Sequence, residues 1–424
     1  MAITTGSVAE LCAAAHAAAP ALAASSREAR DGALEAIAAG LESSTAEILA
    51  ANESDLEAGR QAGLDNALLD RLALDPERIA AIAAGTRAIA ALEDPVGEVL
   101  EERTLANGLE LEKLRVPLGV VAVVYEARPN VTIDSASLCL KAGNAVVLRG
   151  SASAANSNAV LARIAAEGVE SAGLPAAAVT LVGGGDRSEL GELATQDRFV
   201  DLIIPRGGEG LKKALEGVAT VPVIFAAAGN CHVYVDASAD LEMAARIAFN
   251  AKVQRPGVCN AAETLLVHRD VAAGFLELAA PQLLEAGVEI RADERALAAI
   301  GPAPGGGVAK ATDADWETEF LAPVLAVGIV DSVEEAIAHI DRFGSGHSEA
   351  IVTEDAEAAR KFGVAVDAAC VYVNASTRFT DGGEFGMGAE IGNSTQKLHV
   401  RGPIGLRELC TYKYVIRGNG QIRE

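Results

Sequence analysis

Apolar residues recur at helical spacing along almost the whole of the first 95 residues. Turn and capping signals interrupt this pattern within residues 52–74. Residues 97–117 then alternate in the manner of strands, and the pair Asn107-Gly108 is typical of a hairpin turn. The sequence therefore predicts a helical N-terminal region followed by a β-hairpin.

From Val120 onward, short β runs alternate with helical patterns such as residues 156–173 and 187–196. Parallel strands need crossover connections, and helices usually supply them, so this rhythm predicts a parallel sheet built from βαβ units. The expected strands are residues 120–126, 145–150, 179–184, 201–208 and 221–227.

A second α/β stretch follows a helical pattern at residues 241–252. It ends in a glycine-rich segment, residues 380–394, and a further strand pattern within 406–420. A chain of 424 residues is too long for one ordinary core, so the α/β fold class is expected to comprise two or three domains. The β and helical runs of this second stretch are residues 322–332, 334–344, 349–355 and 369–376.

Composition and cysteine spacing indicate the cellular compartment and exclude some classes of protein. No apolar run is long enough to span a bilayer, and the alanine-rich N-terminus lacks the basic region of a signal peptide, which predicts no membrane association. The six cysteines are far apart and form no CxxC pair. This spacing indicates neither a disulfide framework nor a zinc site, and it predicts a cytoplasmic protein without a bound metal.

The formal charge of −24 argues against nucleic acid as a partner. The basic residues are 26 arginines and 9 lysines, which together make the 35 of the composition. An acidic, lysine-poor chain suits a high-salt cytoplasm, but a GC-rich genome also enriches alanine and arginine. Net charge concerns solubility and leaves both explanations open.

Cys259 stands on a tight connection. The helical pattern before it ends at Arg255-Pro256-Gly257, because proline lacks a donor and restricts the preceding residue, and a short strand pattern follows at 263–268. Buried, inert cysteines are the commoner kind, and Cys139 and Cys370 fit that description because they lie in apolar runs. The position of Cys259 predicts a reactive thiol instead.

Glycines mark where a dinucleotide would bind, although the chain has no G-x-G-x-x-G fingerprint. Gly184 and the pair Gly207-Gly208 follow predicted strands, where phosphate oxygens approach backbone N–H groups at a helix N-terminus. The alternative is that they are simple turn glycines. Taken with the five regularly spaced β runs, the cofactor interpretation is preferred.

The residues after the second expected strand are Arg149-Gly150-Ser151, a cation and a hydroxyl without a carboxylate. Many NAD enzymes place an acid here for the ribose hydroxyls. The composition favours a 2′-phosphate and therefore NADPH/NADP. The alternative is that Arg149 lies on a solvated loop.

Several segments together resemble the gamma-glutamyl phosphate reductases, a branch of the aldehyde dehydrogenase superfamily. The similarity extends from about residue 111 to 414. The segments are VYEARPNVT (124–132), KAGNAVVLRG (141–150), DLIIPRGG (201–208), QRPGVCNAAETLLVH (254–268), GSGHSEAIVTED (344–355) and TRFTDGGEFGMGAEIG (377–392).

The resemblance implies an aldehyde-dehydrogenase-like fold with a Rossmann-type cofactor-binding domain, residues 1–96 and 118–228. It also implies an α/β catalytic domain, residues 229–397, and a small oligomerisation β element, residues 97–117 and 398–416. An isolated two-stranded hairpin is only marginally stable, so this element is expected to pair with another subunit in a homo-oligomer.

The implied reaction is the NADPH-dependent reduction of L-glutamyl 5-phosphate to L-glutamate 5-semialdehyde, with release of phosphate, in proline biosynthesis. Because an acyl phosphate is labile, a glutamate 5-kinase is expected to supply it nearby. Two alternatives remain open. One is a hydrolytic or coenzyme-A-acylating aldehyde dehydrogenase, and the other is a catalytically silent paralogue with a structural role. The presence of both Cys259 and Asn130 disfavours the silent paralogue.

The resemblance also implies residue roles. Cys259 is the nucleophile that forms a thioester, and the Asn130 side chain and the Cys259 N–H stabilise the oxyanion. As a nearby cation, Arg255 is expected to help lower the pKa of the thiol and to contact the substrate. Glu319 matches the carboxylate that holds the nicotinamide ribose. The other expected contacts are Arg206 with cofactor phosphate, and Ser376, Thr377 and Arg378 with the α-carboxylate or the departing phosphate.

Two further expectations concern a missing general base and two histidines of ambiguous role. Hydrolytic relatives place a glutamate base shortly after the last strand of the cofactor domain, where this chain has alanines at 226–228. The thioester is therefore expected to wait for hydride or phosphate. His232 and His347 are candidate ligands or acids, but a lone histidine is more often structural.

Overall fold

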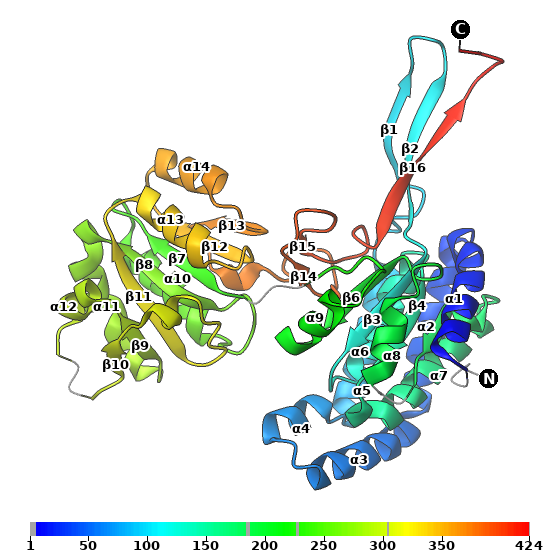
Figure 1. Ribbon diagram of the computed structural model, residues 1–424, viewed down its shortest axis with the longest axis horizontal. Coiled ribbons are helices and arrows are strands. Elements are labelled where there is room, and N and C mark those ends of the chain that lie inside the picture. The colour runs from blue at the N-terminus through cyan, green and yellow to red at the C-terminus, as the bar shows by residue number, and fades with distance from the viewer. Residues whose placement is uncertain (1–5, 184–186, 226–228, 303–304, 424) are drawn as a thin grey trace. The chain divides into compact units, whose positions relative to one another are not determined.

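The computed structural model describes residues 6–183, 187–225, 229–302 and 305–423 (Figure 1). The chain divides into two compact units. Unit 1 comprises residues 1–225, 386–392 and 404–424, and unit 2 comprises residues 226–385 and 393–403. The glycine-rich segment, residues 380–394, contributes to both units, and the predicted domain boundaries stay a prediction.

The N-terminal region of unit 1 is helical, as the periodicity predicts. Several helices begin at a residue whose side chain accepts from the first turn, and Ser7 forms a capping box with Glu10. The helices are α1 (Val8–Ala23), α2 (Arg27–Ser43), α3 (Thr45–Gln61), α4 (Asn66–Leu72) and α5 (Pro76–Ala91).

Unit 1 contains a four-stranded parallel sheet in the order β5-β4-β3-β6. The first four predicted strands are confirmed. In its described part, residues 221–225, the fifth is reduced to a bridge between Ile203 and Val223, where Pro222 has no N–H to donate, and residues 226–227 lie outside the described residues. The elements are β3 (Val120–Tyr125), α6 (Asn130–Lys141), β4 (Ala145–Arg149), η1 (Ala152–Ala154), α7 (Ala155–Ser171), η2 (Ala176–Ala178), β5 (Val179–Leu181), α8 (Arg187–Ala194), β6 (Leu202–Arg206) and α9 (Glu209–Glu216).

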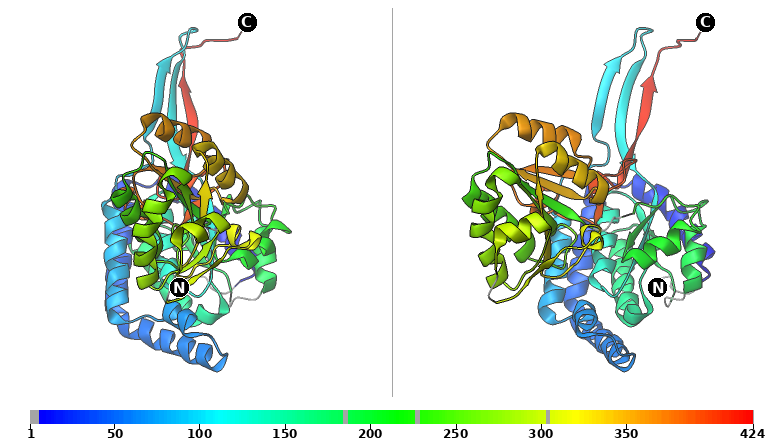
Figure 2. Two further views of the ribbon diagram at one scale, coloured as in Figure 1. Left: turned by 90° about the vertical axis from the view of Figure 1, so that its left-hand side faces the viewer. Right: turned by 60° about the vertical axis from the view of Figure 1, so that its left-hand side comes forward.

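A separate antiparallel sheet consists of β1 (Val99–Thr104), β2 (Glu110–Pro117) and β16 (Cys410–Arg417), which lie side by side in both views of Figure 2. The predicted hairpin turn is confirmed, and Gly108 has a φ of 80°, which glycine adopts without strain. The C-terminal strand joins the hairpin, so the sheet has three strands. The segment 398–409 does not contribute a strand to it.

Unit 2 is built on a seven-stranded parallel sheet in the order β10-β9-β11-β8-β7-β12-β13. The strands are β7 (Cys231–Val235), β8 (Ala262–His268), β9 (Glu289–Ala292), β10 (Val308–Lys310), β11 (Val324–Val330), β12 (Ser348–Val352) and β13 (Cys370–Val373). A short antiparallel pair, β14 (Asn393–Ser394) and β15 (Gly402–Pro403), also belongs to this unit.

Helices cover both faces of this sheet because successive strand residues point to opposite sides. The helices are α10 (Leu241–Val253), α11 (Arg269–Glu285), α12 (Glu294–Ile300), α13 (Val333–Phe343) and α14 (Ala356–Ala365), with short turns η3 (Asp313–Trp316) and η4 (Thr377–Phe379). Val233 and Val235 of β7 pack in the core with α10, α11 and α12, whereas Tyr234 packs in the core with α13 and α14. Among the described residues, no helix is both long enough and apolar enough to cross a membrane.

Candidate active site

Cys259 lies on the connection between α10 and β8, residues 254–261, which we call the catalytic loop. Its side chain is exposed, whereas the other five cysteines are buried. A Cβ added to Gly229 would lie 1.7 Å from the Cys259 carbonyl oxygen, so only glycine permits this close approach. The thiol of Cys231 donates to the same oxygen at 3.2 Å. The loop is thus fixed by its backbone while the Cys259 thiol is accessible.

A buried ion pair joins the residues on either side of the catalytic loop. Lys252 lies in the last turn of α10 and Glu263 near the start of β8, and neither residue is exposed. The Lys252 Nζ and Glu263 Oε2 are 2.5 Å apart, and the Leu321 N–H donates to the other carboxylate oxygen at 3.3 Å. Burial raises the pKa of Glu263 to about 7 and lowers the pKa of Lys252. Neither residue was predicted from the sequence to be part of the site.

Arg378 contacts the other side of the catalytic loop. Its Nε donates to the Gln254 side chain at 2.7 Å, and its Nη1 donates to the Asn260 side chain. Desolvation and then the charge of Arg255 lower the pKa of Arg378, while Cys259 acts in the opposite direction. The structure therefore brings Cys259, Arg255 and Arg378 together, as a group that handles an anion would require.

Ser376 and Thr377 are placed differently from Arg378. The Ser376 hydroxyl accepts from the Arg378 N–H at 3.3 Å and caps η4, and the Thr377 hydroxyl donates to the Asn260 carbonyl at 2.7 Å. Both side chains are buried. These bonds hold η4 against the catalytic loop, and the assignment of the two hydroxyls to substrate stays a prediction.

Glu319 precedes β11 in unit 2. Its Oε1 accepts from the Gly229 N–H at 2.6 Å. The carboxylate therefore supports the same glycine that approaches the Cys259 carbonyl. Its contact with the nicotinamide ribose stays a prediction.

In unit 1, the expected oxyanion donor lies at the carboxyl end of the parallel sheet. Asn130 begins α6, directly after the loop that follows β3. Its Nδ2 donates to the Asp134 Oδ2 at 2.9 Å. Burial raises the pKa of Asp134 to about 6, although the charge of Arg206, at the end of β6, opposes the increase. These three residues gather between β3 and β6, where the strand order reverses and ligands bind in such sheets.

The glycines of the expected cofactor loops differ in the space that surrounds them. A Cβ at Gly150 would lie 2.0 Å from the Asn158 Nδ2, and one at Gly207 would lie 2.8 Å from the Leu211 side chain, so a side chain at either position would force its neighbours to move. Gly208 has open space where a Cβ would be, at the N-terminus of α9. Gly184 lies outside the described residues. Of the described glycines in these loops, Gly208 has the most room beside it, and its N–H donates to the Glu126 Oε2 at 3.4 Å.

Arg149 ends β4 and is only 7% exposed, so the interpretation that it lies on a solvated loop is wrong. The Ser151 hydroxyl accepts from the Ala127 N–H at 3.1 Å and lies 2.6 Å from the Ser153 hydroxyl. It thereby ties the loop after β4 to the loop after β3. Cations at the ends of β4 and β6 share one edge of the sheet with the N-terminus of α9, which fits a phosphorylated dinucleotide.

The two histidines are held inside unit 2. His232 is buried, its N–H donates to the Glu349 Oε2 at 2.7 Å, and its Nδ1 lies 3.0 Å from the same oxygen. Burial lowers the pKa of His347 to about 4, and its Nδ1 lies 2.8 Å from the Ser348 hydroxyl. These contacts support structural roles for both histidines.

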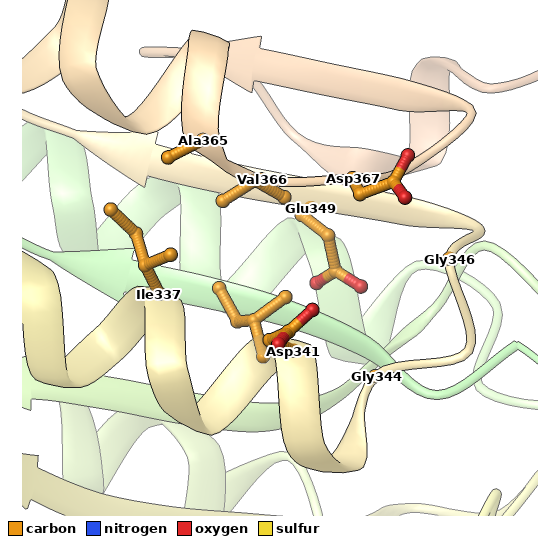
Figure 3. A pocket seen from close by; sticks show the side chains of 9 residues that line it. Ile337, Asp341, Gly344, Gly346, Glu349, Ala365, Val366 and Asp367 are labelled. Atoms are coloured by element: carbon orange, nitrogen blue, oxygen red, sulfur yellow. The ribbon is translucent and has the colours of Figure 1, made fainter.

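Glu349, the partner of His232, points into a cavity of about 80 Å³ (Figure 3). Asp341 of α13 and Asp367 line the same cavity. Within the described residues, no group of three or more His, Cys, Asp or Glu side chains could hold a metal ion. A polar cavity of this size suits water.

Comparison with known proteins places this geometry in a family. The family described as "Aldehyde dehydrogenase family" matches residues 1–303 and 307–415. The gamma-glutamyl phosphate reductase of Heliobacterium modesticaldum is 55% identical over 398 residues, 94% of each chain. That of Roseiflexus castenholzii is 52% identical over 418 residues, 98% of this chain and 99% of the relative.

Solved structures agree. The crystal structure of gamma-glutamyl phosphate reductase from Thermotoga maritima matches with a TM-score of 0.96 and 43% identity, covering 99% of this chain and 100% of the other. An acetylating aldehyde dehydrogenase from Geobacillus thermoglucosidasius shares only the fold, with 19% identity and a TM-score of 0.68, over 98% of this chain and 97% of the other. The chain therefore belongs to the gamma-glutamyl phosphate reductases of the aldehyde dehydrogenase family.

Proposed function

We propose that this chain reduces L-glutamyl 5-phosphate to L-glutamate 5-semialdehyde with NADPH, releasing phosphate in proline biosynthesis, through a thioester on Cys259. The observation that carries the mechanism is an exposed thiol on a fixed loop beside two arginines. The identity to reductases over most of the chain supports the substrate.

The Cys259 thiolate attacks the γ-carbonyl carbon of the acyl phosphate. A C–S bond forms, the bond from carbon to the phosphate oxygen breaks, and phosphate leaves with the electron pair. The cations Arg255 and Arg378 favour the thiolate, and they can also receive the departing phosphate. The Asn130 amide and the Cys259 N–H donate to the oxyanion of the tetrahedral species.

NADPH, when bound, supplies the hydride that converts the thioester into the aldehyde. Its phosphates would be held by Arg149, Arg206 and the backbone at Gly150, Ser151, Gly184, Gly207 and Gly208. Glu319 would hold the nicotinamide ribose. The chain's own residues keep the acyl group at Cys259 and donate to its oxygen until the hydride arrives.

The chemistry of the loop region also argues against hydrolysis. Water attack on a thioester needs a general base within hydrogen-bond reach. The alanines at 226–228, which take the place of the glutamate of hydrolytic relatives, lie outside the described residues. Two of the carboxylates described near the catalytic loop are already engaged, Glu263 with Lys252 and Glu319 with the Gly229 N–H.

The test runs the reaction in reverse, with the semialdehyde and NADP. In phosphate-free buffer we expect at most about one turnover per site, because the thioester has no acceptor, and steady NADPH production once phosphate is added. Cys259→Ala is the matched control, with NADPH binding retained and turnover absent in both buffers. A parallel sample receives coenzyme A instead of phosphate.

Sustained production of glutamate without phosphate would contradict the reductase mechanism and favour the hydrolytic alternative. Turnover restored by coenzyme A and not by phosphate would favour the acylating one. Residual steady turnover in the Cys259→Ala variant would exclude a covalent intermediate on this residue.

We also propose that the chain is a homo-oligomer that associates through the sheet β1-β2-β16. Tyr412, Tyr414 and Ile416 alternate along β16, and each is about half exposed. β16 is an edge strand of this sheet among the described residues, and an apolar edge favours pairing with another chain. Because the acyl phosphate is labile, we propose in addition that a glutamate 5-kinase delivers it nearby.

A further inference from the structure

We propose that Asp134 is a positioning residue that sets the orientation of the Asn130 amide toward the oxyanion. This inference rests on the proposed function, in which Asn130 is an oxyanion donor. The two residues lie four positions apart on the first turns of α6, so their side chains are neighbours on one face of the helix.

The hydrogen bond between them determines which end of the amide faces which way. An Asn side chain presents an oxygen on one side and an NH₂ on the other, and the two ends are similar in shape. An ionised carboxylate can only accept. The Asn130 Nδ2 must therefore face the Asp134 Oδ2, and it does so at 2.9 Å. The rotated amide would place its oxygen against the carboxylate, which is repulsive.

Only one of the two Nδ2 hydrogens is used by Asp134. The second is fixed in the amide plane and is the one that can donate to a developing negative charge. Without the carboxylate, the amide has no such constraint, and the rotated form would present its oxygen where the donor is required. Asp134 thereby acts on the reaction through Asn130 and does not need to touch the substrate.

The charge state of Asp134 suits this role. Burial raises its pKa to about 6, and Arg206 limits the increase. At pH 8 the carboxylate is therefore ionised and remains an acceptor. Arg206 ends the neighbouring strand β6, so its positive charge partly offsets the negative charge of Asp134 next to the oxyanion site.

The experiment is a double-mutant cycle at pH 8 in the phosphate-dependent reverse assay, with Asn130→Ala, Asp134→Leu and the double variant. We expect Asn130→Ala to lower kcat by about 10²–10³-fold. Asp134→Leu should lower kcat by about 10-fold, because a charge-assisted hydrogen bond to the donor is lost. The KM values for semialdehyde and NADP should stay within about twofold, since neither ligand loses a contact.

In the double variant, Asp134→Leu should cause no further loss beyond Asn130→Ala, because its effect passes through the amide. Asp134→Asn should recover part of the activity, since its carbonyl oxygen can still accept from Nδ2. Glu167→Leu is a control for the loss of a carboxylate four residues from its partner on a helix, because Glu167 accepts from Arg163 on the exposed side of α7, and it should be fully active. Melting curves establish that each variant is folded.

Full activity of Asp134→Leu, or an equal loss in the presence and absence of Asn130, would overturn the inference. If Asn130→Ala is itself fully active, the oxyanion role in the proposed function fails and the inference fails with it. If Asp134→Leu does not fold, the cycle made with Asp134→Ala, which also removes the acceptor, decides by the same criterion.

Discussion

Removing Lys252 should destabilise unit 2 in a way that depends on pH. Lys252→Met keeps the length of the side chain but leaves the Glu263 carboxylate in a fully buried position without its cation. Breaking a buried pair in this way typically costs about 3–5 kcal/mol, whereas replacing both partners by apolar residues is often neutral. The structure also gives the direction in which pH changes this cost.

The pKa of folded Glu263 is about 7, against an ordinary value of 4.5. The native state therefore binds this proton more tightly than the unfolded chain, and the stability associated with it is lost as pH rises from about 4.5 to about 7. In Lys252→Met the carboxyl loses the favourable charge, and its pKa should rise further, toward the values of about 8–9 documented for buried glutamates. The variant therefore continues to lose stability above pH 7.

Each pH unit in that range corresponds to about 1.4 kcal/mol. Between pH 7 and pH 8.5 the variant should lose about 2 kcal/mol more than the unaltered protein. Lys252→Met/Glu263→Leu should remove this extra dependence, because no buried carboxyl remains to titrate.

The assay is urea unfolding followed by tryptophan fluorescence at pH 6, 7 and 8.5. The chain has a single tryptophan, Trp316, which lies in η3 of unit 2, so the signal reports on the unit that contains the pair. A penalty that is equal at the three pH values, or a double variant as unstable as Lys252→Met, would refute this account of the pair.

Two further outcomes are expected. If the formal charge of −24 is a salt adaptation, molar salt should raise the melting temperature markedly by screening self-repulsion, and a melting curve indifferent to salt would favour the GC-rich explanation. Ile416→Lys, which adds a charge to the half-exposed edge strand β16, should give a smaller particle in sedimentation velocity with the secondary structure retained; an unchanged particle size would exclude β16 as the contact between subunits.

Much of the fold could be predicted from the sequence because its signals are local. The buried β runs and intervening helical patterns indicate parallel sheets wherever they occur. The exposed position of Cys259 follows from Pro256 and Gly257, which end α10 before the strand begins. Within residues 221–225 the expected strand shortens to a bridge for the same kind of local reason, because Pro222 cannot donate to a ladder.

The supports of the site could not be predicted because they depend on contacts between distant segments. A lysine in the last turn of a helix usually interacts with the helix dipole and water, so Lys252 gives no sign of burial. The one available signal was Glu263, a carboxylate inside a strand with an apolar centre, residues 265–267. The need for glycine at 229 comes from the Cys259 carbonyl thirty positions later, which only the adjacency of β7 and β8 brings close.

The glycines show the opposite limitation. A cluster of glycines after a strand predicts a phosphate site, and it equally predicts close packing, because both require the absence of a Cβ. At Gly150 and Gly207 the nearest atoms belong to the chain itself, whereas at Gly208 the space is open. Only the positions of the surrounding side chains distinguish these two reasons. They favour Gly208, at the N-terminus of α9, as the phosphate contact.

The arrangement around Cys259 also explains why a costly ion pair is kept in the core of unit 2. A nucleophile must be accessible, which places it on a loop, but a loop that moves by an ångström loses much of its catalytic advantage. Here the loop is held by glycine contact at Gly229, by the Cys231 thiol, by the Lys252–Glu263 pair at its base and by Asn260 with Arg378. These supports come from separate elements of the unit. The buried charges therefore act as part of the scaffold that keeps an exposed thiol in one place.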